Sequence, residues 1–181
     1  MDEGRTDDAD RALAAARVAE AAARRRDRRR EAELAGSEIT LRGVLGGLAE
    51  LAAWATIERG GHRTVVAVRS VGSDMVAVAD EAGRTGFLRL AAVAVVEPVG
   101  VIGTPIAAEP TATARTFADA VADLCGTGEV TLLRTVQGTE LRGLVSAAGS
   151  DVVELRQRGE PAAAAYVALD SLSEVWSSSR G

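Results

Sequence analysis

The sequence of 181 residues contains no lysine and no asparagine, so all 21 of its basic residues are arginine. The absence of lysine excludes a P-loop and Schiff-base chemistry. A single cysteine, Cys125, excludes an intrachain disulfide and a cysteine zinc site. Aromatic residues make up only 3% of the chain, so its core must be built from leucine and β-branched residues. Arginine in place of lysine, with abundant alanine, glycine and valine, is typical of a high-GC genome.

Long apolar runs are also missing. No stretch reaches 18 apolar residues, so we expect no transmembrane helix and no membrane partner. The N-terminal MDEGRTDDAD is acidic and lacks the basic and apolar regions of a secretory signal. We therefore expect a cytoplasmic protein. A hydrophobic content of 47% with 26% charged residues is ordinary for a soluble globular chain.

Changes in composition divide the chain into four segments. Residues 1–37 form a charged arm, and their high helix propensity predicts a long helix over 8–35. Residues 38–97 begin with an amphipathic stripe that predicts a helix at about 39–53, and short β-branched runs follow from 54. Residues 98–115 carry three of the four prolines and are interpreted as a linker. Residues 116–181 repeat the order of helix and strands, with Thr116 as the expected helix cap and an apolar helix face formed by Phe117, Val121 and Leu124.

The two β-rich segments align with one another. Gly72-Ser73-Asp74 matches Gly149-Ser150-Asp151 at an offset of 77 residues. After a two-residue insertion the offset becomes 79, which places Phe87 on Tyr166 and Leu90 on Leu169. Apolar positions agree over about five strands, so the sequence predicts an internal duplication.

One helix followed by five short strands in each copy resembles the Sm-like (LSm and Hfq type) small β-barrel. The second copy carries the resemblance best. Leu141–Val145, with Gly143 at the expected bend, and Asp151–Leu155 resemble strands two and three of that family. Tyr166–Val175 resembles strands four and five. The resemblance predicts a mostly β fold: two tandem Sm-like small barrels, each with an N-terminal helix, preceded by a long charged α-helix.

The resemblance implies RNA binding and assembly through pairing of the fourth and fifth strands of neighbouring units. This chain departs from the family at the RNA site. It has no asparagine after the aspartate of the turn, and strand four is followed by Leu90-Ala91-Ala92 or Leu169-Asp170-Ser171 instead of a basic loop. No site residue is therefore transferred. The strand pairing is expected either within the chain or between chains.

A catalytic constellation is not recognisable, and we expect no enzyme activity and no cofactor. His62, the only histidine, lies at a Gly-Gly-His-Arg turn and is interpreted as a solvated turn residue. Cys125 lies next to Leu124 at the end of an amphipathic helix and is interpreted as a partly buried side chain. No catalytic or metal-ligating residue is predicted.

The arm contains the one cluster with a functional interpretation. Residues 1–37 hold nine arginines and nine acidic residues, whereas residues 38–181 hold 12 arginines and 17 acidic residues and so carry the whole net charge of −5. Dense arginines suit nucleic-acid phosphates. The predicted nucleic-acid-binding residues are Arg24, Arg25, Arg26, Arg28, Arg29 and Arg30.

The alternative is a solvated helix in which these arginines are balanced by neighbouring acidic residues one turn away: Glu20, Asp27, Glu31 and Glu33. The two interpretations of the arginine cluster predict two different classes of partner. The chain is a non-enzymatic regulatory protein that binds RNA or DNA through its arm, or it is a protein-interaction scaffold without nucleic-acid affinity.

Overall fold

The structure is a computed structural model that describes residue 20 and residues 24–26, 39–100, 113–157 and 163–177. The chain divides into two compact units, Met1–Thr40 and Leu41–Gly181. In the first unit, Glu20 and Arg24–Arg26 are helical. The rest of the predicted helix over 8–35 lies outside the described residues. The second unit holds both predicted β-rich segments.

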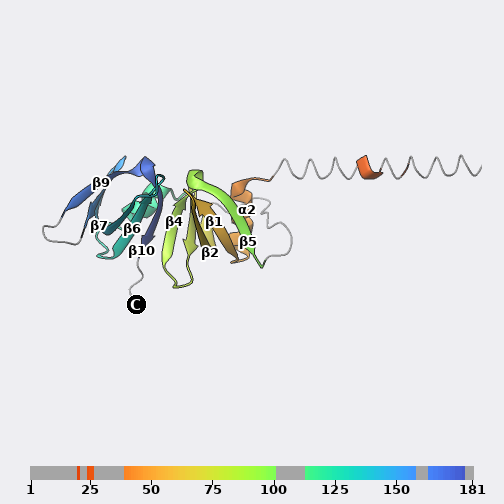
Figure 1. Ribbon diagram of the computed structural model, residues 1–181, viewed down its shortest axis with the longest axis horizontal. Helices are drawn as coiled ribbons and strands as arrows, with labels where there is room; N and C mark the ends of the chain where they lie inside the picture. Colours follow the sequence, from red (N-terminus) through yellow and green to blue (C-terminus); the bar gives the residue numbers. More distant parts are fainter. Residues whose placement is uncertain (1–19, 21–23, 27–38, 101–112, 158–162, 178–181) are drawn as a thin grey trace, which may run out of the picture. The chain divides into compact units, whose positions relative to one another are not determined.

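Ten strands of the second unit form one antiparallel sheet (Figure 1). The strands are β1 (Trp54–Arg59), β2 (His62–Val71), β3 (Met75–Ala79), β4 (Thr85–Arg89), β5 (Val93–Val99), β6 (Val130–Thr135), β7 (Glu140–Ala148), β8 (Val152–Arg156), β9 (Ala164–Ala168) and β10 (Leu172–Ser177). Their order across the sheet is β5-β1-β2-β3-β4-β10-β6-β7-β8-β9. The prediction of a mostly β fold is confirmed, and β5 extends into the segment that was predicted as a linker.

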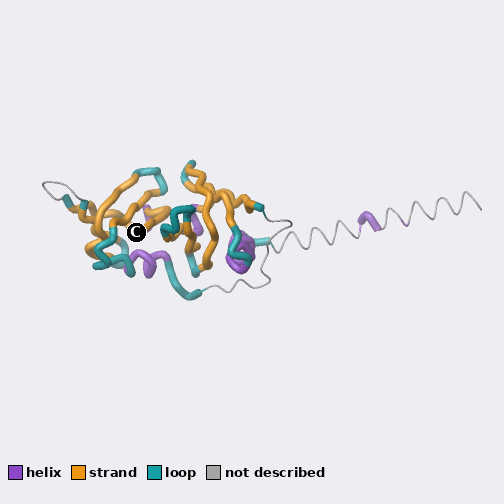
Figure 2. Tube along the Cα trace, turned by 90° about the horizontal axis from the view of Figure 1, so that it is seen from below, coloured by secondary structure: helices purple, strands orange, loops and turns teal. Residues whose placement is uncertain are grey.

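The strands curve along their length (Figure 2), but the expected small barrels are not closed. β4 pairs with β10, with Gly86 opposite Trp176 and Leu88 opposite Glu174. This pairing provides hydrogen-bond partners for backbone N–H and C=O groups that would be unpaired at the edge of a separate barrel. It also continues the sheet from the first half, β1–β5, into the second half, β6–β10. Of the two expected ways of pairing, the structure shows the one within the chain. Among the described strands, β5 and β9 each have one neighbour and form the two edges.

Helix α2 (Leu41–Glu50) is shorter than the predicted 39–53. Its Leu45 and Leu48 are fully buried as the amphipathic stripe predicts, but Leu51 is 61% exposed. The helix ends because Ala52 adopts a positive φ of 47° and the Ala53 N–H donates to the Leu48 carbonyl, which is a typical C-terminal cap.

Helix α3 (Phe117–Ala122) begins at the predicted cap. The Asp119 N–H donates to Thr116 Oγ1 at 3.0 Å, and the Thr116 N–H donates to Asp119 Oδ2 at 2.8 Å. This reciprocal capping box satisfies two backbone donors at the start of the helix. The predicted apolar face is buried, with Phe117 and Val121 at 0% and Leu124 at 8% exposure.

Two hydrophobic cores lie on opposite faces of the central strands. Met75, Ala77 and Phe87 belong to the core that contains α3. The alternating residues Val76, Val78 and Leu88 belong to the core that contains α2. Because successive strand residues point to opposite faces, β3 and the middle of β4 are buried on both sides. The same holds for the first five residues of β10.

The two halves share irregularities at the offsets that the sequence comparison predicts. The β2–β3 ladder shifts register between Val68 and Ser70, and the β7–β8 ladder shifts between Val145 and Ala147, 77 residues later. Turn hydrogen bonds also correspond. Gly72 N–H donates to Met75 and Gly149 N–H to Val152, both at 2.8 Å. The Leu90 N–H donates to Asp74 at 2.9 Å, and the Leu169 N–H donates to Asp151 at 2.8 Å.

Candidate nucleic-acid interface and charged junction

The predicted arginine cluster is described in part. Arg24, Arg25 and Arg26 are exposed on a helical turn, whereas Arg28, Arg29 and Arg30 lie outside the described residues. Arg24 donates to Glu20 at 2.6 Å, and the two side chains are 72% and 62% exposed. This pair has the one-turn spacing of the solvated-helix interpretation. An exposed pair of this kind contributes little to stability and leaves the guanidinium accessible.

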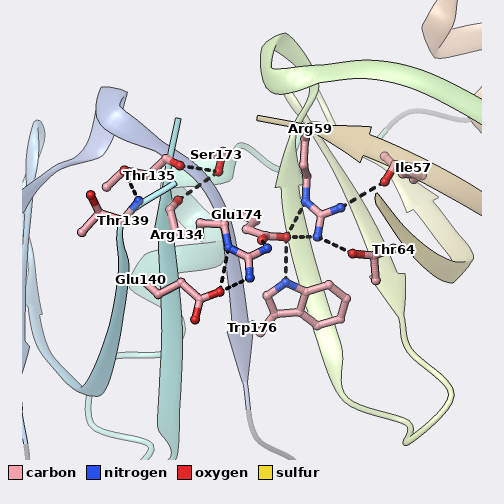
Figure 3. A network of polar contacts seen from close by, with 10 residues as sticks. All are labelled: Ile57, Arg59, Thr64, Arg134, Thr135, Thr139, Glu140, Ser173, Glu174 and Trp176. Carbon is pink, nitrogen blue, oxygen red and sulfur yellow. Dashed lines mark hydrogen bonds and ion pairs between the residues drawn. The ribbon is translucent and has the colours of Figure 1, made fainter. Parts of the chain in front are cut away.

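A second charged cluster, the junction network, joins the two halves of the sheet (Figure 3). Glu174 on β10 accepts hydrogen bonds from Arg59 of β1 and Arg134 of β6, and from the Trp176 indole N–H at 2.8 Å. Arg134 also pairs with Glu140 of β7. The network therefore ties the last strand of the second half to the first strand of the first half.

Strand register explains why these groups meet. Glu174 lies opposite Arg134 on the neighbouring strand β6, and Arg134 lies opposite Glu140 on β7. Cross-strand neighbours of opposite charge attract each other on one face of a sheet. Arg59 reaches the same carboxylate from the end of β1, and it also contacts the Thr64 hydroxyl at 3.3 Å.

The central ion pair of the junction network is buried, so it matters for the stability of the fold. Arg59 is 1% exposed and Glu174 is 0% exposed. Desolvation lowers the pKa of Arg59, and the negative charge of Glu174 acts in the opposite direction. Since a buried charge without a partner is costly, each of these residues requires the other. The Glu174 carboxylate receives donors from two guanidinium groups and an indole, so the geometry suits a structural clamp better than a general base.

Two open hollows lie beside Trp176, and both are lined by Arg84 and Leu132. One also includes Arg59, Arg134 and Asp80, and the other includes Arg142. Arg84 donates to Asp80 at 2.6 Å, and the junction network pairs Arg59 and Arg134 with Glu174 and Glu140. The four arginines thus exceed their carboxylate partners by one charge, which is small within a unit that is acidic as a whole.

The sequence interpretations of single residues can be placed in the structure. His62 is exposed at the start of β2, and Cys125 is partly buried against the α3 core. The turn aspartate Asp74 accepts a hydrogen bond from the Phe117 N–H at 2.6 Å, so it fixes the start of α3. Within the described part of the chain, no group of three or more His, Cys, Asp and Glu side chains is arranged to hold a metal.

The junction network was missed by sequence reasoning. Its one local signal is Glu174, a lone charge between apolar and small residues in LSEVW. The sequence does not indicate that its partner is Arg59, 115 positions away. Gly86 is a second missed residue, since a Cβ there would lie 2.7 Å from the Trp176 ring.

Comparison with family models, with curated proteins and with solved structures finds no match for this chain. Among the described residues, no helix is long and apolar enough to cross a membrane.

Proposed function

We propose that the second unit is a duplicated Sm-like module. Each half has a helix followed by five strands, and in each half the fifth strand pairs with the first. The fourth strand of the first half, β4, pairs with the fifth strand of the second half, β10. This is the pairing expected between neighbouring Sm-like units. The shared bulges and turn hydrogen bonds support the duplication.

We further propose that the protein is a non-enzymatic cytoplasmic regulator that binds RNA or DNA phosphates through its arginine-rich arm. The observation that carries this proposal is the exposure of Arg24, Arg25 and Arg26 at consecutive helical positions. Guanidinium groups bind phosphate oxygens with multiple donors and release counterions. Residues 38–181 hold 12 arginines against 17 acidic residues, so the sheet unit repels polyanions. Binding is therefore confined to the arm and follows the backbone without reading the base sequence.

Filter binding of the full chain to random RNA and to duplex DNA, at two salt concentrations, tests this proposal. Each phosphate contact contributes about 0.9 to the slope of log K against log salt for duplex DNA and about 0.7 for single strands. Replacing Arg24, Arg25, Arg26, Arg28, Arg29 and Arg30 by glutamine should abolish binding at both salts. The matched control replaces the exposed sheet residues Arg63, Arg69, Arg142 and Arg156 by glutamine, and it should bind as the parent chain does. Absence of binding at low salt, or unchanged binding by the arm variant, would overturn the proposal.

The alternative, a protein-interaction module, is favoured by one specific observation. The two edge strands carry exposed apolar side chains, with Tyr166 on β9 at 72% exposure and Val95 and Val99 on β5 at 38% and 47%. Unpaired strand edges are templates for pairing with another chain. This alternative predicts a protein complex that forms through β5 or β9, with no measurable nucleic-acid affinity.

A further inference from the structure

The smaller of the two hollows beside Trp176 has an apolar floor. Val130 and Leu132, both half-buried, alternate along β6 and therefore project from one face of the sheet. Leu132 lies opposite Trp176 on β10 and opposite Arg142 on β7. Directly opposite residues of an antiparallel pair share a face, so the indole, Leu132 and Arg142 follow one another across the sheet. The floor is hydrophobic and ends at a positive charge.

The Trp176 ring is held in this floor from two sides. Its N–H donates to Glu174 at 2.8 Å (Figure 3). On β4, Gly86 leaves room for the ring, because a Cβ there would lie 2.7 Å from it. The floor is therefore formed before a ligand binds, which reduces the entropy that binding costs.

Arg84 and Arg142 both line this hollow. The guanidinium carbon of Arg84 lies 6.0 Å from the centroid of the Trp176 ring. Asp80 accepts from its Nε at 2.6 Å, which leaves the terminal nitrogens of Arg84 without a hydrogen bond to any described residue. Arg142 is exposed, and it forms neither a hydrogen bond nor an ion pair with the part of the chain that the structure describes. Two guanidinium groups thus have donors available at one apolar hollow.

The larger hollow adjoins the first, since both are lined by Arg84, Leu132 and Trp176. Its other two arginines, Arg59 and Arg134, are already paired with Glu174. The positive charge that exceeds the carboxylate partners therefore belongs to Arg142, at the rim of the smaller hollow. An anion that enters there displaces no carboxylate of the junction network.

We propose that this site binds a small organic anion, with its carboxylate or phosphate group at Arg84 and Arg142 and its apolar part over Leu132 and Trp176. Guanidinium groups match the oxygens of both anionic groups. The two hollows have volumes of about 70 and about 110 Å³, whereas pockets for drug-sized ligands have about 300–1,000 Å³. The ligand is therefore no larger than a single ring or a short chain. The proposal goes beyond nucleic-acid binding by the arm and does not depend on it.

Nuclear magnetic resonance of the full chain labelled with nitrogen-15 tests this proposal, because the indole N–H groups of Trp176 and Trp54 give separate signals. The probes are benzoate and phenyl phosphate, which carry the two anionic groups on the same ring. Benzamide lacks the charge and inorganic phosphate lacks the ring. We expect a saturable shift of the Trp176 signal with at least one organic anion, no shift of the Trp54 signal, and roughly tenfold weaker binding of benzamide and of inorganic phosphate. The organic anion that binds at lower concentration identifies the preferred group.

Replacing Arg142 by glutamine should weaken binding of the better probe about tenfold, because it removes a charged hydrogen-bond donor. The matched control is Arg69→Gln, which removes the same charge from an exposed position on β2 that lines neither hollow. Circular dichroism of both variants should match the parent chain, which separates lost binding from lost folding. The arm variant of the preceding section should bind the probes normally, so failure of nucleic-acid binding leaves this test unaffected.

Three outcomes would overturn the proposal. The first is no saturable shift of the Trp176 signal with either organic anion. The second is equal binding of benzamide or of inorganic phosphate, since the charge or the apolar floor would then contribute nothing. The third is an Arg142→Gln chain that binds the probes as tightly as the Arg69→Gln chain does.

Discussion

At the scale of single residues, the charged positions were the hardest to interpret from sequence. Glu174 lies in a strand where all residues except the last are buried, and its partners Arg59 and Arg134 come from two other strands. Exposure of a charged residue is the usual expectation, so nothing local distinguishes Glu174 from the exposed glutamates. The interpretations of His62 and Cys125 agree with the structure because each depended on immediate neighbours in the chain.

Replacing Glu174 by glutamine should destabilise the fold strongly. The substitution leaves Arg59 buried beside a neutral amide, and removing one partner of a buried ion pair costs about 3–5 kcal/mol. Urea unfolding at neutral pH measures this loss. The control is Glu140→Gln, because Glu140 pairs with the same Arg134 but its side chain is 38% exposed. Equal losses from the two substitutions would contradict the role assigned to the buried pair.

Gly86 should be replaceable by alanine only at a measurable cost. A Cβ at position 86 would lie 2.7 Å from the Trp176 indole, and such overpacking in a core costs about 1–3 kcal/mol. Gly149→Ala is the matched control, since a Cβ there meets its nearest atom at an ordinary 3.5 Å. Thermal unfolding followed by tryptophan fluorescence compares the two variants. Similar midpoints for both would show that the junction accommodates the methyl group.

At the scale of elements, local sequence signals were accurate. The Thr116 cap and the apolar face of α3 were predicted because capping and helical periodicity depend on residues within four positions. Strand positions followed from β-branched runs and glycine turns for the same reason. The predicted C-terminal end of α2 lies beyond the observed one, because the positive φ of Ala52 cannot be recognised from the type of residue at that position.

The capping box should make stability depend on acid. Hydrogen bonds from the Thr116 backbone and hydroxyl groups hold the pKa of Asp119 below its ordinary value. A carboxyl whose pKa is lower in the folded state contributes stability above its unfolded pKa of about 4, and this contribution is lost as pH falls through the folded value. Asp119→Asn should therefore reduce the loss of unfolding free energy between neutral pH and about pH 3.

Urea unfolding of the parent chain and of Asp119→Asn at both pH values measures the difference. The variant will retain part of the acid dependence, because Asp80 and Glu140 also have lowered pKa values through their arginine partners. An identical acid dependence in the two proteins would show that Asp119 does not stabilise the helix in the folded state.

At the scale of the whole molecule, sequence reasoning predicted two similar segments but did not predict how they join. The offsets of 77 and 79 came from turn and strand positions, which are local. The pairing of β4 with β10 is between segments about 90 residues apart, and periodicity cannot select among the edges that are available. Two tandem small barrels were expected for this reason, whereas the structure has one continuous sheet with a core on each face.

Amide hydrogen exchange of the parent chain tests this arrangement most directly. The account predicts slow exchange in β4 and β10, because their backbone groups pair with each other inside the chain. It predicts fast exchange along the outer edges of β5 and β9, which each have one neighbour among the described strands. Exchange in β4 and β10 that is as fast as at the outer edges of β5 and β9 would contradict it.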